Sequence, residues 1–208
     1  MTSPLSLNRQ DITAVILAGG KARRMGGEDK GLIELHGRPL LDYIIARLRP
    51  QAGAILINAN RNLARYRDFG YPVVEDILGD YFGPLVGMAT GMLSAGTPLL
   101  LTVPCDSPFV PDNLGETLHR ALLESDADIC VAHDGIRLQP VYALLRCHLL
   151  PDLQAYLHDG GRKIDAWYEQ HCTVPVDFSA TPDVFLNLNT PEDRQQIENK
   201  LGNSQGIA

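Results

Sequence analysis

The stretch AVILAGGKARRMGGEDK, from Ala14 to Lys30, decides the fold class of this chain. Its apolar beginning, residues 14–18, is typical of a strand buried on both faces, as in a parallel sheet. The glycines that follow lack a Cβ and let several backbone N–H groups point at one anion. Four Lys and Arg residues in the same stretch add positive charge. The pattern predicts a strand that opens into a phosphate-binding loop; the alternative is a solvated turn after a core strand.

Two familiar phosphate-binding motifs are absent from this loop. A Walker loop has the form GxxxxGK followed by Ser or Thr, whereas Gly26 and Gly27 precede Glu28 and Asp29 here. The dinucleotide fingerprint GxGxxG is also missing. The loop therefore predicts a phosphate cradle of a third kind.

The composition limits what the chain can be. Its 208 residues are 45% hydrophobic and 21% charged, which is ordinary for one globular domain. We expect a single domain over residues 1–208, with flexible tails at 1–10 and 202–208. No apolar run approaches the ~20 residues of a membrane span, and the polar start MTSPLSLNRQ does not resemble a signal peptide. A cytoplasmic protein without membrane contact is expected.

Charge and cysteine placement argue against two other classes of protein. The formal net charge is −7, whereas a nonspecific grip on nucleic acid needs a basic face. The four cysteines, at positions 105, 130, 147 and 172, show neither zinc-site spacing nor a disulfide framework. Because the basic loop lies in an acidic chain, a small anionic substrate is expected rather than nucleic acid.

Short apolar runs alternate with helical patterns along the chain. After residues 14–18, runs suited to buried strands recur at 54–57, 73–74, 99–103, 129–132 and 141–145. Apolar residues at helical spacing occupy 40–48, 85–93 and 111–123. Such alternation predicts βαβ units. We therefore predict an α/β fold, a three-layer sandwich in which helices cover both faces of a mostly parallel sheet.

Polar residues follow these strands at the point where each strand ends. Ligands of open α/β sheets bind beyond the carboxyl ends of the strands. Asn58 could bind a base or ribose, and Asp76 could accept from the N1–H and N2 amino group of a guanine; loop capping is the alternative for both. Asp106 places a carboxylate at the mouth of a central strand. That oxygen suits Mg²⁺ shared with substrate phosphates, and a turn or helix-cap role is the alternative.

Six motifs, in order along the chain, carry a resemblance to a known family. They are LAGGKARRMGGEDK at 17–30, NANR at 58–61, VVED at 73–76, GPLVGM at 83–88, VPCDSP at 103–108 and FLNLNTPED at 185–193. Together they resemble the molybdenum cofactor guanylyltransferases over residues 12–193. The first motif is shared by a wider group of nucleotidyltransferases, whereas the combination is much more specific. A cytidylyltransferase relative tends to carry Leu-Ala-Ala-Gly at the first motif, so Gly19 favours guanylyl transfer.

The resemblance implies an activity and its participants. It implies a Rossmann-like nucleotidyltransferase fold of the nucleotide-diphospho-sugar transferase type, and transfer of GMP from GTP to molybdenum-loaded molybdopterin, with release of pyrophosphate. Mg²⁺ is the implied cofactor. We expect a monomer with transient contacts to molybdenum-insertion and cofactor-acceptor proteins. The alternatives are CTP as donor on the same cofactor, a sugar-phosphate nucleotidylyltransferase, and a non-catalytic GTP-binding adaptor.

The resemblance also implies roles for individual residues. The nucleotide would be bound by Leu17, Ala18, Gly19, Lys30, Asn58, Asp76 and Asp106. The catalytic residues would be Lys30, Asp106 and Arg24, with Asp106 as the metal ligand and Gly27 helping to shape the phosphate grip.

The pterin would be bound by a second group of residues, Arg162, Lys163, Asn187 and Asn189. Arg162 and Lys163 follow a glycine pair, and the alternative for them is a helix start with solvated charges. His133, Asp134 and Gly135 end an apolar run and are also candidates for the pterin side, with a plain turn as the alternative.

Overall fold

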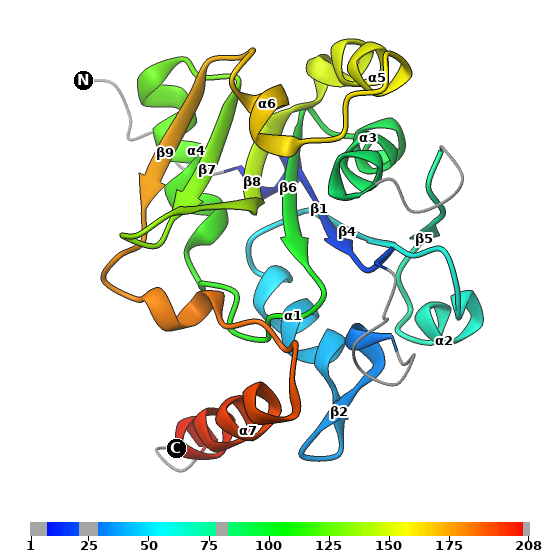
Figure 1. The fold of residues 1–208 in the computed structure, drawn as a ribbon, viewed down its shortest axis with the longest axis vertical. Helices are drawn as coiled ribbons and strands as arrows, with labels where there is room; N and C mark the ends of the chain where they lie inside the picture. Colours follow the sequence, from blue (N-terminus) through cyan, green and yellow to red (C-terminus); the bar gives the residue numbers. More distant parts are fainter. Residues whose placement is uncertain (1–7, 21–28, 78–82, 206–208) are drawn as a thin grey trace.

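A computed structural model gives the arrangement of the chain and describes residues 8–20, 29–77 and 83–205. Within these residues, seven strands form a central sheet in the spatial order β5, β4, β1, β6, β8, β7 and β9 (Figure 1). In that order the strands are Val73–Val74, Ala54–Asn58, Ile12–Leu17, Leu99–Pro104, Leu138–Arg146, Ile129–His133 and Thr173–Asp177.

Strand direction divides the sheet into two parts. β5, β4, β1 and β6 are parallel, whereas β8 is antiparallel to both β6 and β7, and β9 is parallel to β7. Leu17 pairs with Asn58 on one side and with Pro104 on the other. The carboxyl ends of β1, β4 and β6 therefore meet at one edge, and the mostly parallel sheet is confirmed.

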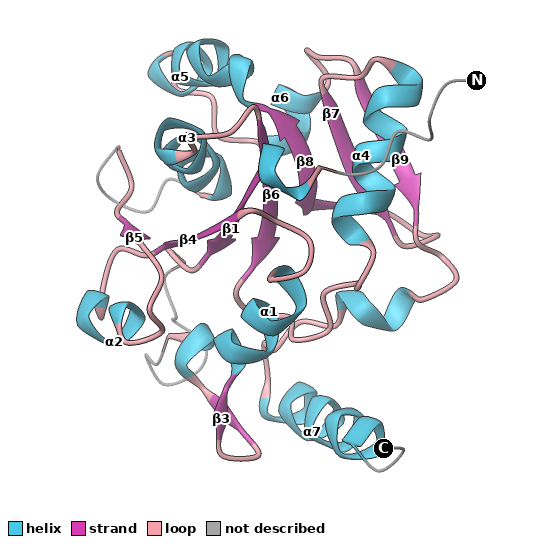
Figure 2. Ribbon diagram, turned by 180° about the vertical axis from the view of Figure 1, so that it is seen from behind, coloured by secondary structure: helices cyan, strands magenta, loops and turns pink. Residues whose placement is uncertain are grey.

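Helices cover both faces of the sheet, which confirms the three-layer α/β class (Figures 1 and 2). Along β1, Ile16 points into one core and Val15 into the other, because successive side chains of a strand point to opposite faces. The first core is covered by α1 (Leu40–Leu48) and α4 (Leu114–Ser125). The second is covered by α3 (Pro84–Ser94), α5 (Leu150–His158) and α6 (Ile164–Tyr168).

The strongly periodic elements match their predicted ranges, and the short or polar ones were missed. α1 spans the predicted 40–48, whereas α4 begins three residues later than predicted because the N–H of Leu114 closes a turn on Pro111 O. β9 was missed because only one of its residues is fully buried. The helices α5 and α6 were not predicted either. The other missed elements are α2 (Leu63–Arg67), the hairpin of β2 (Glu34–Leu35) and β3 (Arg38–Pro39), and α7 (Pro191–Gln205).

The described structure extends into both expected tails. A 3₁₀ helix, η1, spans Arg9–Asp11, and α7 buries Leu201 against the first core. Residues 1–7 and 206–208 lie outside the described residues. None of the helices found in the described ranges has the length and apolar character that crossing a membrane requires.

Candidate active site

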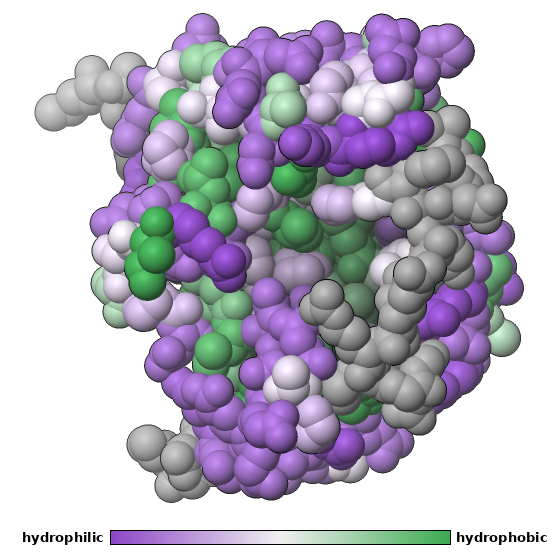
Figure 3. Space-filling view, in the orientation of Figure 1, coloured by the Kyte–Doolittle hydropathy of each residue, from purple (hydrophilic) through white to green (hydrophobic). Residues whose placement is uncertain are grey.

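Two adjoining cavities open at the carboxyl ends of β1, β4 and β6. The larger has a volume of about 400 Å³ and is lined by Gly19, Asn58, Asp76 and the start of α3. The smaller, of about 190 Å³, is lined by Ala18, Asp29, Lys30, Cys105 and Asp106. Leu17, Gly20 and Pro104 line both. Figure 3 shows apolar side chains at the bottom of a recess near the centre of this face.

The larger cavity holds a cluster of amide and carboxylate groups. Asn58 Nδ2 donates to Asp76 Oδ1 at 2.8 Å and to Val74 O at 3.3 Å. A Cβ on Gly87, in α3, would stand 2.5 Å from Asn58 Oδ1, so a glycine is required for the helix to approach this closely. The structure therefore brings Asn58 and Asp76 together beside the backbone of Leu17, Ala18 and Gly19, as the sequence predicts.

The smaller cavity is built around Lys30, at the start of the 3₁₀ helix η2 (Lys30–Leu32). Its Nζ donates to Asp106 Oδ2 at 2.9 Å and to Asn189 Oδ1 at 2.7 Å. These two side chains follow β6 and precede α7, so three distant segments of the chain meet at one ammonium group. The side chains of Lys30 and Asp106 are 23% and 19% exposed, which leaves both accessible from the cavity.

A helix cap places Asn189. Asp193 Oδ2 accepts from the backbone N–H groups of Asn189 and Thr190, at 3.0 and 2.8 Å, and the N–H of Asp193 donates to Thr190 Oγ1. This reciprocal arrangement is a capping box at the start of α7. Burial acts to raise the pKa of Asp193, but the hydrogen bonds from Asn189 and Thr190, together with the charge of Lys30, outweigh it and the pKa is lowered.

An ion pair between the buried carboxylate of Asp29 and the partly exposed Arg61 supports the segment that carries Lys30. Asp29 is 4% exposed; it pairs with Arg61 and accepts from Asn62 Nδ2 at 2.9 Å. The turn that leads into η2 is thus attached to the segment between β4 and α2. Sequence reasoning missed Asp29 and Arg61 as supporting residues, although both lie within motifs of the resemblance.

Two buried side-chain oxygen atoms, one of them on Asp106, are relevant to whether a cation fits at this site. Asp106 Oδ1 and Asn187 Oδ1 are buried and have no hydrogen-bond partner among the described residues. In the described ranges no group of three or more His, Cys, Asp or Glu side chains could hold a metal. Mg²⁺ typically takes one or two protein carboxylates and completes its shell with phosphate and water oxygens. Asp106 fits that pattern, with Oδ1 as the available ligand atom.

The thiol of Cys105, which precedes Asp106, is unreactive. Burial, reinforced by the neighbouring Asp106 carboxylate, raises the pKa of Cys105 to about 12. Cys105 therefore stays a neutral thiol near pH 7 and contributes no nucleophile to the cavity it lines.

A third cavity, of about 590 Å³, continues the cleft past Asp106. The antiparallel strand β8 forms much of its wall, and Arg137, Asp165 and Asn187 line it together with Asp106. Arg137 is exposed and was not predicted, because it stands in a hairpin turn and not after an apolar run. Of the predicted pterin residues, Asn187 lines this cavity and Asn189 binds Lys30 beside it.

The turn between β7 and β8 is stabilised by Asp134. Its Oδ1 accepts from the backbone N–H groups of Ile136 and Arg137, both at 2.8 Å, and its Oδ2 accepts from Gln139 Nε2 at 2.6 Å. The bonds from Arg137 and Ile136 lower the pKa of Asp134. Asp134 thus has the turn role that was the alternative to pterin contact, and it positions Arg137.

Arg162 and Lys163 take structural places between α5 and α6. Arg162 Nη1 donates to Leu157 O at 2.6 Å and to Gly161 O at 2.5 Å, which satisfies carbonyl groups at the end of α5. Lys163 precedes α6, and its carbonyl accepts from Tyr156 Oη at 3.1 Å. Neither is among the described residues that line the three cavities. Their contact with pterin stays a prediction.

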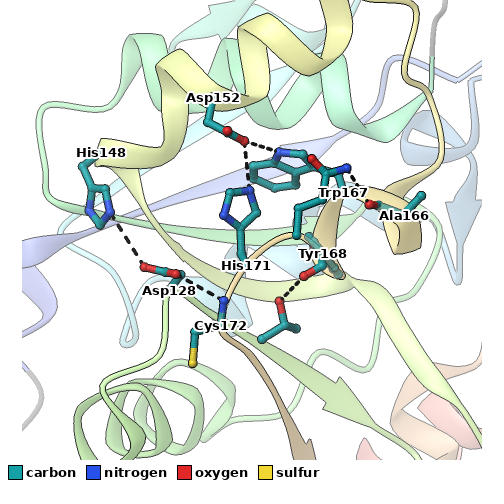
Figure 4. A network of polar contacts seen from close by, with 10 residues as sticks. Asp128, His148, Asp152, Ala166, Trp167, Tyr168, His171 and Cys172 are labelled. Carbon is teal, nitrogen blue, oxygen red and sulfur yellow. Dashed lines mark hydrogen bonds and ion pairs between the residues drawn. The ribbon is translucent and has the colours of Figure 1, made fainter.

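A polar network holds α6 in place behind this cleft (Figure 4). Asp152 Oδ1 accepts from Trp167 Nε1 at 2.8 Å and lies 2.9 Å from His171 Nε2. Tyr168, beside the fully buried Trp167, donates from its hydroxyl to Pro140 O at 2.8 Å. The network therefore anchors the β8 wall of the third cavity.

Arg24 and Gly27, which the sequence predicts to bind phosphate, lie outside the described residues.

Comparison with known proteins agrees with this geometry. The family model described as MobA-like NTP transferase domain matches residues 14–174. The chain is 50% identical over 190 residues to a molybdenum cofactor guanylyltransferase of Shewanella loihica, covering 91% of this chain and 97% of that protein. It is 47% identical over 194 residues to the protein of that name from Shewanella halifaxensis, covering 93% and 97%.

A solved structure shares the fold. The chain superposes on molybdopterin-guanine dinucleotide biosynthesis protein A from Archaeoglobus fulgidus with a TM-score of 0.75 and 19% identity. The superposition covers 92% of this chain and 99% of that protein.

Proposed function

The chain belongs to the molybdenum cofactor guanylyltransferases, within the MobA-like NTP transferase domain family, and from that premise we propose that it transfers GMP from GTP to molybdenum-loaded molybdopterin. One observation carries the proposal. Lys30 joins Asp106 and Asn189 directly beside the cavity that holds Asn58 and Asp76. The cleft thus offers a pocket suited to a base, a cation suited to phosphates and a carboxylate suited to a metal.

The larger cavity is proposed to bind the guanine. Guanine presents two adjacent donors, N1–H and the N2 amino group, and an ionised carboxylate accepts at both oxygens. Asp76 offers such a carboxylate, and Asn58 already donates to one of its oxygens. Leu17 and Gly19 line this pocket from the β1 side, and Ala18 lines the adjoining smaller cavity.

The transfer needs little covalent chemistry from the protein. A terminal phosphate of molybdopterin would form the new P–O bond to the α-phosphorus of GTP, while the bond to the leaving pyrophosphate breaks in line. That phosphate is already an anionic nucleophile, so no general base is required. The protein acts by orienting the two substrates and by neutralising charge, with Lys30 placed to offset the charge that builds on pyrophosphate.

Asp106 would hold the magnesium ion through Oδ1, together with phosphate oxygens. When bound, Mg²⁺ would withdraw negative charge from the triphosphate. The third cavity, with Arg137 at its wall, is proposed to receive the pterin. Because all of these side chains come from one chain, we propose a monomer that contacts molybdenum-insertion and cofactor-acceptor proteins transiently; light scattering with and without substrates tests its mass.

Isotope transfer tests the function. The expected result is that label from [α-³²P]GTP appears on molybdopterin, whereas label from [γ-³²P]GTP appears in pyrophosphate alone. Label on the pterin from the γ position would contradict the proposal, because it would identify a kinase. Asp106→Asn is the inactive control, and Asp112→Asn, an exposed carboxylate away from the cleft, is the matched active control.

Other nucleotides and acceptors are distinguished by binding. Thermal stabilisation with GTP, CTP, ATP and UTP in the presence of Mg²⁺ is expected to be largest with GTP, since a ligand at ~100 times its Kd adds about 2.7 kcal/mol. Preference for CTP would favour cytidylyl transfer. GTP binding without pyrophosphate release, in the presence of molybdopterin, would indicate an adaptor.

A further inference from the structure

Asn60 holds the carboxylate of Asp76 more completely than any residue assigned to the nucleotide above. Its Nδ2 donates to Asp76 Oδ2 at 2.7 Å, and its Oδ1 accepts from the backbone N–H of Asp76 at 2.9 Å. A single side chain thus binds both the side chain and the main chain of Asp76. The rotation of that carboxylate is restrained at the same time as its position.

The backbone around Asp76 is restrained from a second direction. The N–H of the next residue, Ile77, donates to Thr90 Oγ1 at 3.0 Å, and Thr90 Oγ1 donates to Val86 O within α3 at 2.8 Å. Asn58 Nδ2 occupies the other carboxylate oxygen. Each oxygen of Asp76 therefore receives one amide donor and retains lone-pair capacity for a further one. That is the acceptor pair needed for a ligand with two adjacent N–H donors.

Gly19 leaves the space that Asn60 occupies. A Cβ on Gly19 would stand 2.9 Å from Asn60 Nδ2, and 3.4 and 3.6 Å from the nearest oxygens of Asn58 and Asp76. The amide of Asn60 is the end of a side chain and can move away. Any such movement would lengthen its hydrogen bond to Asp76.

We propose that Asn60 is a positioning residue for base selection: it presents both oxygens of Asp76 to the N1–H and N2 amino groups of guanine, and it does so in the space left by Gly19. This inference rests on the proposed function, because it presumes that Asp76 binds the base. Asn60 itself acts through Asp76 and needs no contact with the nucleotide.

Inosine triphosphate provides the selective probe, since it retains N1–H and lacks the 2-amino group. The measurement is the ratio of Kd values for ITP and GTP, by calorimetry with the full chain and Mg²⁺. Asn60→Ala is expected to lower this preference for GTP about tenfold, because the oriented acceptor for the second donor is lost. Affinity for ITP is expected to change less than threefold, and the Tm reports folding separately.

Two further variants keep the test decisive. Asn60→Asp has nearly the same shape and keeps an acceptor for the N–H of Asp76, but it replaces the donor to Asp76 Oδ2 by a carboxylate oxygen that repels it. It is therefore expected to lose the GTP preference even if Asn60→Ala does not fold. Asn199→Ala, on the exposed surface of α7, is the matched control and is expected to keep the wild-type ratio.

The failures are distinguishable. If the wild-type chain binds ITP as tightly as GTP, guanine recognition by Asp76 is wrong and the inference is overturned with it. If the wild-type chain prefers GTP and both Asn60 variants keep that preference, the function stands and the inference alone is overturned.

Gly19→Ala tests the steric part of the inference. The substitution is expected to reduce the GTP preference severalfold in the wild-type background and to have little further effect in Asn60→Ala, because the group that the new methyl displaces is already absent. Independent, additive losses would show that Gly19 does not act through Asn60 and would overturn that part.

Discussion

The proposed nucleotide side and the proposed acceptor side of the cleft are built by different means. On the nucleotide side, Asn58 and Asp106 come from the carboxyl ends of the parallel strands β4 and β6, which flank β1. On the acceptor side, β8 runs antiparallel to β6, so residues 138–142 at its beginning reach the same edge. The parallel strands bring the residues that follow them to this edge of the sheet. The antiparallel strand β8 instead brings the residues that precede it and its own first residues.

This difference explains which arginine side chain lines the third cavity, which is proposed to bind the acceptor. Arg137 lines the cavity because the β7–β8 turn places it there. Arg162 follows a glycine pair and looks in sequence like an anion ligand, yet it donates to carbonyl groups at the end of α5. A basic residue that follows a glycine pair in the sequence therefore does not by itself indicate an anion-binding site.

The largest expected effect is on the nucleotide side, at Asp106. Asp106→Asn removes the charge proposed to hold magnesium and is expected to lower kcat by about 10²–10³-fold, with a smaller change in GTP affinity. Pyrophosphate release and calorimetric GTP binding measure the two. Near-normal turnover at saturating Mg²⁺ would show that Asp106 is not the metal ligand.

The next effect is on the support of Lys30. Arg61→Ala leaves the buried Asp29 carboxylate without its ion-pair partner, and because Arg61 is 33% exposed we expect a loss of about 2 kcal/mol in unfolding free energy, below the range for fully buried pairs. Urea denaturation measures it. The double variant Arg61→Ala with Asp29→Asn should recover part of the loss, and no recovery would argue against an electrostatic cause.

Substitution of Arg137 and of Arg162 tests directly which of the two arginines binds the acceptor. Arg137→Ala is expected to raise the KM for molybdopterin about tenfold with little change in the KM for GTP, which corresponds to losing one charge-assisted contact. Arg162→Ala is expected to lower the unfolding free energy and to leave both KM values near wild type. If Arg162→Ala raised the KM for molybdopterin and Arg137→Ala did not, the pterin-binding residue would be Arg162.

The smallest effect concerns the cap that places Asn189. Because the pKa of Asp193 is lowered from its usual 3.8 in the folded chain, its contribution to stability is present above about pH 4 and is lost as the pH falls through the lowered pKa. Asp193→Asn is expected to cost about 1 kcal/mol at pH 7 and progressively less below pH 4. A pH-independent difference would contradict the linkage.

The sequence by itself determined the fold class and the position of three polar residues at the carboxyl edge of the sheet. Buried parallel strands are continuous apolar runs, and a residue that follows such a run must lie at the carboxyl edge, so Asn58, Asp76 and Asp106 were placed by strand order alone. Their type also indicated the chemistry, since amides and carboxylates are what a guanine and a metal-bound triphosphate require.

Tertiary structure alone decided the partners of those residues and the acceptor wall. The contact between Lys30 and Asn189 joins positions 159 residues apart. The hydrogen bond between Asn60 and Asp76 joins the loop after β4 to the loop after β5. No local pattern encodes such distances, because they depend on how α7 and the loop after β5 pack. The direction of β8 was also set by packing: its apolar run is the same whether the strand is parallel or antiparallel, yet its direction decides that Arg137 lines the cleft.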